Sequence, residues 1–158
     1  MIEVRSDITK SHDRVWEELA RPGARLTGEE RLSVARELRV ARNCVLCLGS
    51  KNSLSVAYDF GGHDRVDSNV PDVWIELVHK LANDPGRIHR SWVQKLLQDG
   101  LEEVQYVEIA GLVSAVCVVD TFHEALSLPL RPLPKSLSGA ASYNRPATAA
   151  DEGAYVSM

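Results

Sequence analysis

Apolar residues recur along most of the chain at spacings of three and four, the pattern of helices that bury one face. Turn residues such as Gly, Pro, Asn and Asp separate these periodic stretches. The pattern therefore predicts an all-α, single-domain bundle of about six helices. The expected helices span residues 12–20, 27–42, 44–58, 70–82, 88–98 and 102–126.

Local signals mark several helix ends. Ser11 is a candidate N-cap of the first helix, and Asn69 with Pro71 opens the fourth. Thr27 and Glu30 form a capping box, in which each side chain satisfies a free backbone N–H of the first turn. In the second helix the charged residues are predicted to lie opposite the apolar stripe: Arg31, Arg36, Glu37, Arg39 and Arg42.

The last helix is almost wholly apolar from residue 109 to 119. A helix that is apolar on all sides is buried, so this one is predicted to be central. Together with two Trp-bearing helices it offers more nonpolar surface than one 158-residue chain can bury, which predicts a homo-oligomer. The longest apolar run, Leu112–Val119, is shorter than the roughly 20 residues that span a membrane, so no membrane partner is expected.

Two segments lie outside the helical pattern. Residues 59–70, DFGGHDRVDSNV, form a polar connection that is expected to border a site. Four of the seven prolines follow Leu128, which separates a helical domain (1–134) from a tail (135–158). The tail is either disordered or an extended strap on the same or a neighbouring subunit, docked through Tyr143, Tyr155 and Val156.

The composition limits which cellular compartment and which partners are expected. Eighteen Lys and Arg against 22 Asp and Glu give a net charge of −4, which does not favour a nucleic-acid partner. The first 20 residues carry several charges and no apolar signal segment. The reducing cytoplasm is therefore the expected compartment, and a disulfide scaffold is not expected.

Cys44 and Cys47 form a C-x-x-C, whose spacing on a helix allows a reversible disulfide. A helix beginning at Cys44, with Arg42 before it and Lys51 one turn after Cys47, favours lowered thiol pKa values. The alternatives are an inert packed pair, or a zinc site, which needs a second pair of ligands that the spacing does not supply. Cys117, within the apolar helix, is interpreted as a small buried hydrophobe.

Three stretches carry a resemblance to a known family: RLSVARELRVARNCVLC, PDVWIELVHKLANDPGRIHRSW and LEEVQYVEIAGLVSAVCVVDTFHEALSLPLRPLP. They are similar to the alkylhydroperoxidase D-like and carboxymuconolactone decarboxylase superfamily, in particular its peroxidase-related branch. The resemblance implies an all-helical domain, oligomers built from helical faces, and thiol-dependent peroxidase or disulfide oxidoreductase chemistry. It also implies that Cys47 attacks the peroxide and Cys44 resolves, whereas position alone favours Cys44 as the activated sulfur.

Two positions depart from the family's catalytic pattern. The glutamate slot falls at Leu32 and the histidine slot at Lys51, so the family's proton relay cannot be carried over. Lys51 lies four residues after Cys47, where a fixed cation would hold that sulfur as thiolate; the alternative is a solvated surface lysine.

Proton-transfer groups are therefore expected elsewhere. Glu37 lies seven residues before Cys44 and shares its face if the helix continues through Asn43; otherwise it is a solvated carboxylate. Glu108 begins the apolar part of the last helix, where it is either a site residue or the partner of an Arg. His63 and His123 are further candidates to replace the relay, while the remaining histidines are interpreted as surface or helix-side residues: His12, His79 and His89.

These features predict a thiol-disulfide oxidoreductase that reduces hydroperoxides or disulfides through Cys44 and Cys47. A dithiol reductant protein or a small thiol would return the electrons, and no bound cofactor is expected because the chain has no nucleotide-binding fingerprint. The alternative is a degenerate, non-catalytic superfamily member that serves as an oligomerisation or partner-binding module. A lactone-processing decarboxylase is less favoured, since those relatives need not carry C-x-x-C.

Overall fold

The computed structural model describes residues 4–53, 62–66, 69–144 and 147–148, and the regular structure within them is entirely helical. The all-α class predicted from periodicity is confirmed. Six α-helices and one short 3-10 helix follow one another along the chain: α1 (Ser6–Leu19), α2 (Gly28–Ala41), α3 (Val45–Asn52), α4 (Asp72–Asn83), η1 (Pro85–Arg87), α5 (Arg90–Gln98) and α6 (Glu103–Ala125).

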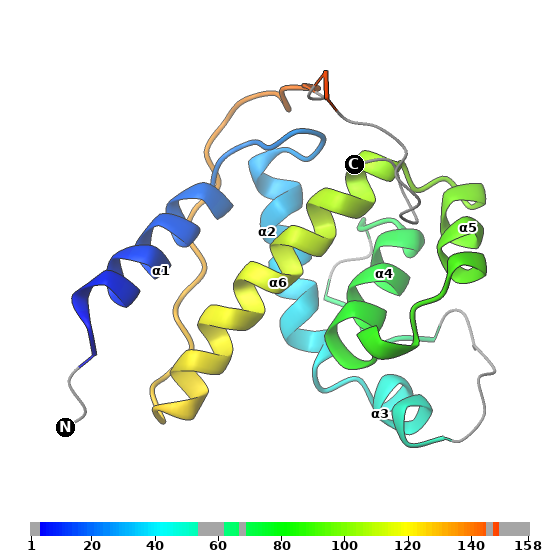
Figure 1. Ribbon diagram of the computed structural model, residues 1–158, viewed down its shortest axis with the longest axis horizontal. Helices are drawn as coiled ribbons and strands as arrows, with labels where there is room; N and C mark the ends of the chain where they lie inside the picture. Colours follow the sequence, from blue (N-terminus) through cyan, green and yellow to red (C-terminus); the bar gives the residue numbers. More distant parts are fainter. Residues whose placement is uncertain (1–3, 54–61, 67–68, 145–146, 149–158) are drawn as a thin grey trace.

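Helices α2, α4 and α6 pack on one another and enclose the core. In Figure 1, α6 crosses the molecule diagonally, with α1 on one side and α4 and α5 on the other. The short α3 packs against α4. The residues at the centre of the core are fully buried and mostly aliphatic: Leu32, Val34, Leu38, Leu77, Val78, Val93, Leu96 and Ile109. Cys44 and Cys47 lie where α2, α3 and α4 meet.

The capping box predicted at the start of α2 is confirmed. Thr27 Oγ1 accepts a hydrogen bond from the Glu30 N–H, and Glu30 Oε2 accepts one from the Thr27 N–H. The predicted solvent face of this helix is wrong in part, because Glu37 is fully buried. Arg39 also points inward, and its guanidinium makes two hydrogen bonds, of 2.9 and 2.8 Å, to the buried carboxylate of Asp120 on α6.

Helix α6 is central, as predicted, but only one of its faces is buried. Ile109, Val113 and Val116 lie in the core, whereas the side chains of Val107 and Val118 are 46% and 63% exposed. By length and composition alone α6 could span a membrane, and a third of its most apolar stretch is buried within the fold. The expectation that this helix is covered on all sides is therefore wrong for the isolated chain.

The starts of two helices differ from the sequence prediction for local reasons. Ser11 lies inside α1 rather than at its start, where its hydroxyl donates to the Asp7 carbonyl one turn back. Pro71, not Asn69, is the N-cap of α4, and its carbonyl accepts from the N–H groups of Trp74 and Ile75.

Helix α3 ends at Asn52 rather than near residue 58, and residues 54–61 lie outside the described part of the chain. Helix α5 begins at Arg90, two residues later than expected, because η1 occupies the turn before it. Its end matches the prediction. Gly100, with φ of 105°, closes the helix while the Leu101 N–H donates to the Leu96 carbonyl.

The described part of the tail is an extended strap that packs on its own chain, which agrees with the strap prediction rather than with disorder. Trp16 Nε1 on α1 donates to the Pro132 carbonyl at 2.7 Å. Further along, the N–H groups of Leu137 and Ser142 donate to the carbonyls of Ala20 and Gly23. Figure 1 shows the orange segment following α1 to the turn that precedes α2.

The end of the described tail packs against the turn between α1 and α2. The Tyr143 N–H donates to the Ala24 carbonyl, and the Arg25 guanidinium lies 4.8 Å from the centre of the Tyr143 ring. At Gly28 the strap and α1 approach so closely that a Cβ would collide with the carbonyl oxygens of Ala20 and Leu137. Tyr155 and Val156, also predicted to dock, lie outside the described residues.

We expect deletion of residues 135–158 to lower the free energy of unfolding by about 2–4 kcal/mol. The deletion removes the backbone hydrogen bonds from Leu137, Ser142 and Tyr143, each worth roughly 0.5–1.5 kcal/mol. Urea denaturation followed by circular dichroism measures the change. A shorter deletion, 149–158, leaves these bonds intact and is the control; equal stability of the two truncated chains would contradict the strap.

Candidate functional site

The two cysteines of the C-x-x-C lie at the start of α3. Helix α2 ends at Ala41, and a tight turn follows in which the Cys44 N–H donates to the Ala41 carbonyl. Cys44 is the N-cap of α3, so the break at Asn43 that the sequence left open is present. Cys44 is 0% exposed and Cys47 is 9% exposed, so Cys47 is the more accessible sulfur.

His79, from the middle of α4, contacts Cys47 in the protein interior. Its Nδ1 lies 3.3 Å from Cys47 Sγ, and its Nε2 lies 2.8 Å from Glu37 Oε1 of α2. His79 and Glu37 are both 0% exposed. The second carboxylate oxygen of Glu37 accepts a hydrogen bond from the Val66 N–H at 3.0 Å. Glu37 therefore fixes both the His79 ring and the described segment 62–66, which precedes α4.

That segment supplies a second histidine. His63 Nδ1 lies 3.3 Å from Cys47 Sγ and 3.7 Å from Cys44 Sγ. On its other side, His63 Nε2 lies 3.2 Å from Glu76 Oε2 of α4. The rings of His63 and His79 are 4.3 Å apart, centre to centre. Cys47 is thus flanked by two imidazoles, each backed by a carboxylate.

The carboxylates determine which ring nitrogen carries a proton. A carboxylate accepts hydrogen bonds, so His79 Nε2 is the protonated nitrogen in its 2.8 Å hydrogen bond with Glu37. The negative charge of Glu76, 3.2 Å from His63 Nε2, favours a proton on that nitrogen as well. Nδ1 of each ring then faces sulfur. It donates a hydrogen bond when Cys47 is a thiolate and the ring is positively charged, and it accepts one when Cys47 is a thiol. One proton can therefore be exchanged between Cys47 and either histidine.

The surroundings favour the thiolate of Cys47. Burial raises its pKa, but the hydrogen bonds from His63 and His79 and their positive charge outweigh burial and lower the pKa to about 6. Burial also raises the pKa of Cys44, yet the backbone N–H of Cys47 and the His63 ring lower it overall.

The histidines shift in the complementary direction. Burial lowers the pKa of His63, but its contacts with Cys47, Glu76 and Cys44 raise the pKa above its usual value. For His79, the contacts with Cys47 and Glu37 likewise raise the pKa against the effect of burial. The structure therefore favours a thiolate beside protonated imidazole.

A cleft of about 520 Å³ opens beside the outer histidine. Its wall includes His63 and Glu76, together with Arg65 and Asp72 at its polar side and Ile75 at its apolar side. Arg65 donates to Asp72 at 2.8 Å, so this ion pair lies at the cleft. The cleft therefore brings small solutes to the His63–Glu76 pair.

Among the residues predicted from sequence, Cys44, Cys47, Glu37 and His63 come together. Glu37 acts through His79, not through the shared helix face on which the prediction depended. Lys51 is exposed at the end of α3, whereas ring nitrogens occupy the hydrogen-bonding positions around Cys47.

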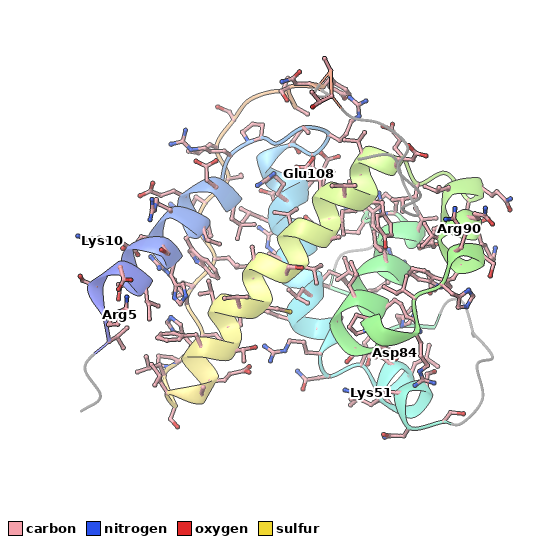
Figure 2. The ribbon with its side chains drawn as sticks, in the orientation of Figure 1. Arg5, Lys10, Lys51, Asp84, Arg90 and Glu108 are labelled. Atoms are coloured by element: carbon pink, nitrogen blue, oxygen red, sulfur yellow. The ribbon has the colours of Figure 1, made fainter. Side chains whose placement is uncertain are left out.

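The other predicted residues lie elsewhere. Figure 2 shows Glu108 near the opposite end of the molecule from Lys51 and α3. Its carboxylate pairs with Arg31 at 2.6 Å and accepts from the Arg25 N–H at 2.7 Å, which is the ion-pair alternative. His123 lies near the end of α6, where its Nδ1 is 2.8 Å from the Pro129 carbonyl. Cys117 is partly buried against the core, and burial raises its pKa.

Sequence reasoning missed His79 and Glu76. His79 was interpreted as a surface or helix-side residue, but it follows Val78 on the buried side of α4 and lies one turn after Ile75. This position in an apolar stripe was the available signal, because a histidine there needs polar partners inside the protein. Glu76 carried no such signal, since its role depends on the position of the preceding loop.

No family model, curated protein or solved structure matches this chain. The resemblance to the alkylhydroperoxidase D-like superfamily therefore stays a prediction. The chemistry of the site rests on its own geometry.

We expect Cys47 in the reduced, metal-free protein to be alkylated with a half-maximal rate near pH 6, because its thiolate persists down to that pH. Iodoacetamide labelling across pH 4.5–10, resolved by peptide mass spectrometry, measures this. Cys117 is the internal control, since burial raises its pKa and should confine its labelling to alkaline pH. A midpoint for Cys47 at about 8.5, the value of a free thiol, would contradict the influence of the histidines.

Proposed function

We propose that the protein is a thiol-disulfide oxidoreductase that reduces hydroperoxides, with Cys47 as the attacking sulfur and Cys44 as the resolving sulfur. The observation that carries the proposal is the position of Cys47 Sγ, 3.3 Å from Nδ1 of both His63 and His79. A thiolate is the nucleophilic form of cysteine, and a neighbouring acid or base is what peroxide cleavage requires. The greater exposure of Cys47 supports the same assignment.

In the first step the Cys47 thiolate attacks the terminal oxygen of the hydroperoxide. The S–O bond forms as the O–O bond breaks, and the departing alkoxide takes a proton from an adjacent imidazolium, leaving as an alcohol or, from hydrogen peroxide, as water. Cys47 becomes a sulfenic acid. General acid assistance of this kind typically contributes about 10²–10⁴-fold to a rate.

In the second step Cys44 attacks the sulfur of the sulfenic acid. The S–S bond forms, the S–O bond breaks, and the hydroxyl leaves as water after it gains the proton that Cys44 gives up. His63 Nδ1 lies 3.7 Å from Cys44 and 3.3 Å from Cys47, so it can carry this proton between them. The two sulfurs together supply the two electrons that reduce the peroxide.

The cycle closes when an external dithiol, from a reductant protein or a small thiol, attacks the Cys44–Cys47 disulfide. Thiol-disulfide exchange returns both cysteines to the reduced state and leaves the reductant as a disulfide. Leu32 and Lys51 occupy the family's expected acid and histidine slots, but the buried Glu37–His79 pair and the His63–Glu76 pair offer the same types of group from other elements.

We also infer that copies of the chain associate through α6. Val107 and Val118 are exposed large hydrophobic side chains on this helix, and a groove between α1 and α6 continues the apolar surface through Val15, Gly111 and Ala115. A second copy presenting the same helix would cover this face by a symmetric contact. This inference is independent of the redox chemistry.

Treatment of the reduced protein with one equivalent of hydrogen peroxide is expected to form a Cys44–Cys47 disulfide and leave Cys117 reduced. Peptide mapping under non-reducing conditions identifies the bridge. A bridge that contains Cys117, or the absence of any bridge, would contradict the proposed function and favour a non-catalytic module.

The histidines supply a sharper test. We expect His63→Ala to slow the reaction of Cys47 with peroxide at pH 7 by about 10–100-fold, because it removes a hydrogen bond to the thiolate and a proton donor. Stopped-flow tryptophan fluorescence or competition with a thiol dye measures the rate. Lys51→Ala is the matched control, because it removes an exposed cation from α3, the helix that carries Cys47. It should change the rate less than twofold. Equal losses of rate in both variants would contradict the activation of Cys47 by His63.

Light scattering at micromolar concentration is expected to return a mass greater than the 17.4 kDa of one chain. Val118→Lys should reduce that mass, because a charge on the apolar face of α6 opposes its burial. Gln94→Lys, at an exposed position of α5, adds the same charge elsewhere and should leave the mass unchanged. A monomer mass for the unaltered chain would exclude the α6 contact.

A further inference from the structure

We propose that the reduced site binds one Zn²⁺ ion through four side-chain atoms: Cys44 Sγ, Cys47 Sγ, His63 Nδ1 and His79 Nδ1. These atoms all lie within 4.8 Å of one another. The sequence offers zinc only as an alternative for the C-x-x-C, because its spacing supplies no second pair of ligands. The fold supplies that pair as two histidines from different segments, the loop before α4 and α4 itself.

The distances between donors fit a tetrahedral ion. With Zn–S of about 2.3 Å and Zn–N of about 2.0–2.1 Å, a tetrahedral site places its sulfur and nitrogen ligands about 3.6 Å apart. The observed separations are 3.3 Å for Cys47 to each histidine and 3.7 Å for Cys44 to His63. These three separations lie within a few tenths of an ångström of the tetrahedral value, and all four atoms lie within 4.8 Å of one another, so a shift of about 1 Å closes the widest separation around an ion.

The carboxylates prepare both rings for coordination. Glu37 accepts a hydrogen bond from His79 Nε2, and the Glu76 carboxylate lies 3.2 Å from His63 Nε2. Both carboxylates favour a proton on Nε2, which leaves the lone pair of the neutral ring on Nδ1, facing the sulfurs. Hydrogen-bonded carboxylates behind metal-binding histidines are the usual arrangement in zinc proteins. Two thiolates and two imidazoles form a soft donor set that suits zinc and disfavours magnesium or calcium.

The ion and the disulfide exclude each other, because both use Cys44 and Cys47. When a hydroperoxide oxidises the zinc-loaded site, two zinc-bound thiolates, one hydroperoxide and two protons give one disulfide, one alcohol, one water and one released Zn²⁺. Four protein ligands leave no open position, which is typical of a structural or regulatory ion. Zinc would thus protect the reduced cysteines and leave when they are oxidised. Binding itself does not rest on the proposed peroxide chemistry; only this release does.

The test uses the full chain, reduced and freed of metal with a chelator. Titration with Co²⁺ is expected to give one equivalent of a complex with sulfur-to-cobalt charge-transfer bands and tetrahedral ligand-field bands, which one equivalent of Zn²⁺ then displaces. A chromophoric chelator measures zinc affinity by competition. Protein oxidised with diamide, which forms the disulfide without peroxide, should bind Zn²⁺ at least 100-fold more weakly.

Variants separate the ligands from their surroundings. His79→Ala and His63→Ala each remove a ligand and should weaken Zn²⁺ binding more than 10-fold. Glu76→Gln should weaken it about 10–100-fold while keeping the cobalt bands, because the ligand set is intact. His89→Ala removes an exposed histidine, and Cys117→Ser removes a sulfur elsewhere; both are controls that should bind as the unaltered chain does. Far-ultraviolet circular dichroism confirms that each variant is folded.

The outcomes distinguish this proposal from the redox function. Reduced protein that shows no sulfur-to-cobalt band, or that binds Zn²⁺ equally well after diamide treatment, would overturn the metal site even if peroxide forms the disulfide. Protein that binds one Zn²⁺ through these ligands but whose metal-free cysteines do not react with peroxide would support the metal site and overturn the proposed function instead.

Discussion

The hydrogen bond between Glu37 and His79 is the constraint on which the site depends. Both side chains are fully buried, and a carboxylate in the protein interior requires partners that replace water. Glu37 finds them in His79 Nε2 and the Val66 N–H, which ties α2 to α4 and to the loop between α3 and α4. Removing one partner of such a buried pair typically costs about 3–5 kcal/mol. Because the ring is held at Nε2, its Nδ1 must face α3, where Cys47 lies.

Other buried carboxylates in the chain have a different role. Asp120 accepts two hydrogen bonds from Arg39, and Glu108 is occupied by Arg31 and the Arg25 N–H. In these pairs the partner is a guanidinium, which stays charged and can only donate hydrogen bonds. A histidine differs because one ring nitrogen can donate to a carboxylate while the other exchanges a proton with a second group. The arginine pairs therefore join helices, whereas the Glu37–His79 pair also reaches a sulfur.

The same four atoms serve both proposals because thiolate stabilisation and metal binding require similar surroundings. A proton shared between Cys47 and an imidazole stabilises negative charge on sulfur, and a divalent cation in the same position does so more strongly. The carboxylates behind the rings assist in both cases, since they stabilise a protonated ring and orient a neutral one. The 520 Å³ cleft lies against the outer pair of this cluster, His63 and Glu76.

The sequence by itself determined the features that depend on residues close together along the chain. Helical periodicity predicted the all-α class, the Thr27–Glu30 capping box marked the start of α2, and Gly100 marked the end of α5. The C-x-x-C was visible as a pair because its residues are three apart. The local signal failed at Ser11, since a serine hydroxyl can bond either to a free N–H at a helix start or, as here, to a carbonyl of the preceding turn.

Only the tertiary structure decided which groups surround the cysteines. Glu37 and His79 are 42 residues apart, and Cys47 and His63 are 16 apart, so no local pattern links them. Periodicity placed Glu37 on the polar side of its helix because the pattern reflects only the apolar residues of that helix. It contains no information on His79, which contacts Glu37 from α4. Lys51 was suggested by its spacing from Cys47 and Glu108 by its apolar neighbours. In the fold, however, Lys51 is exposed at the end of α3, and the packing of α6 on α2 places Glu108 beside Arg31. Long-range packing of the helices, which brings together residues distant along the chain, is thus the physical source of the site.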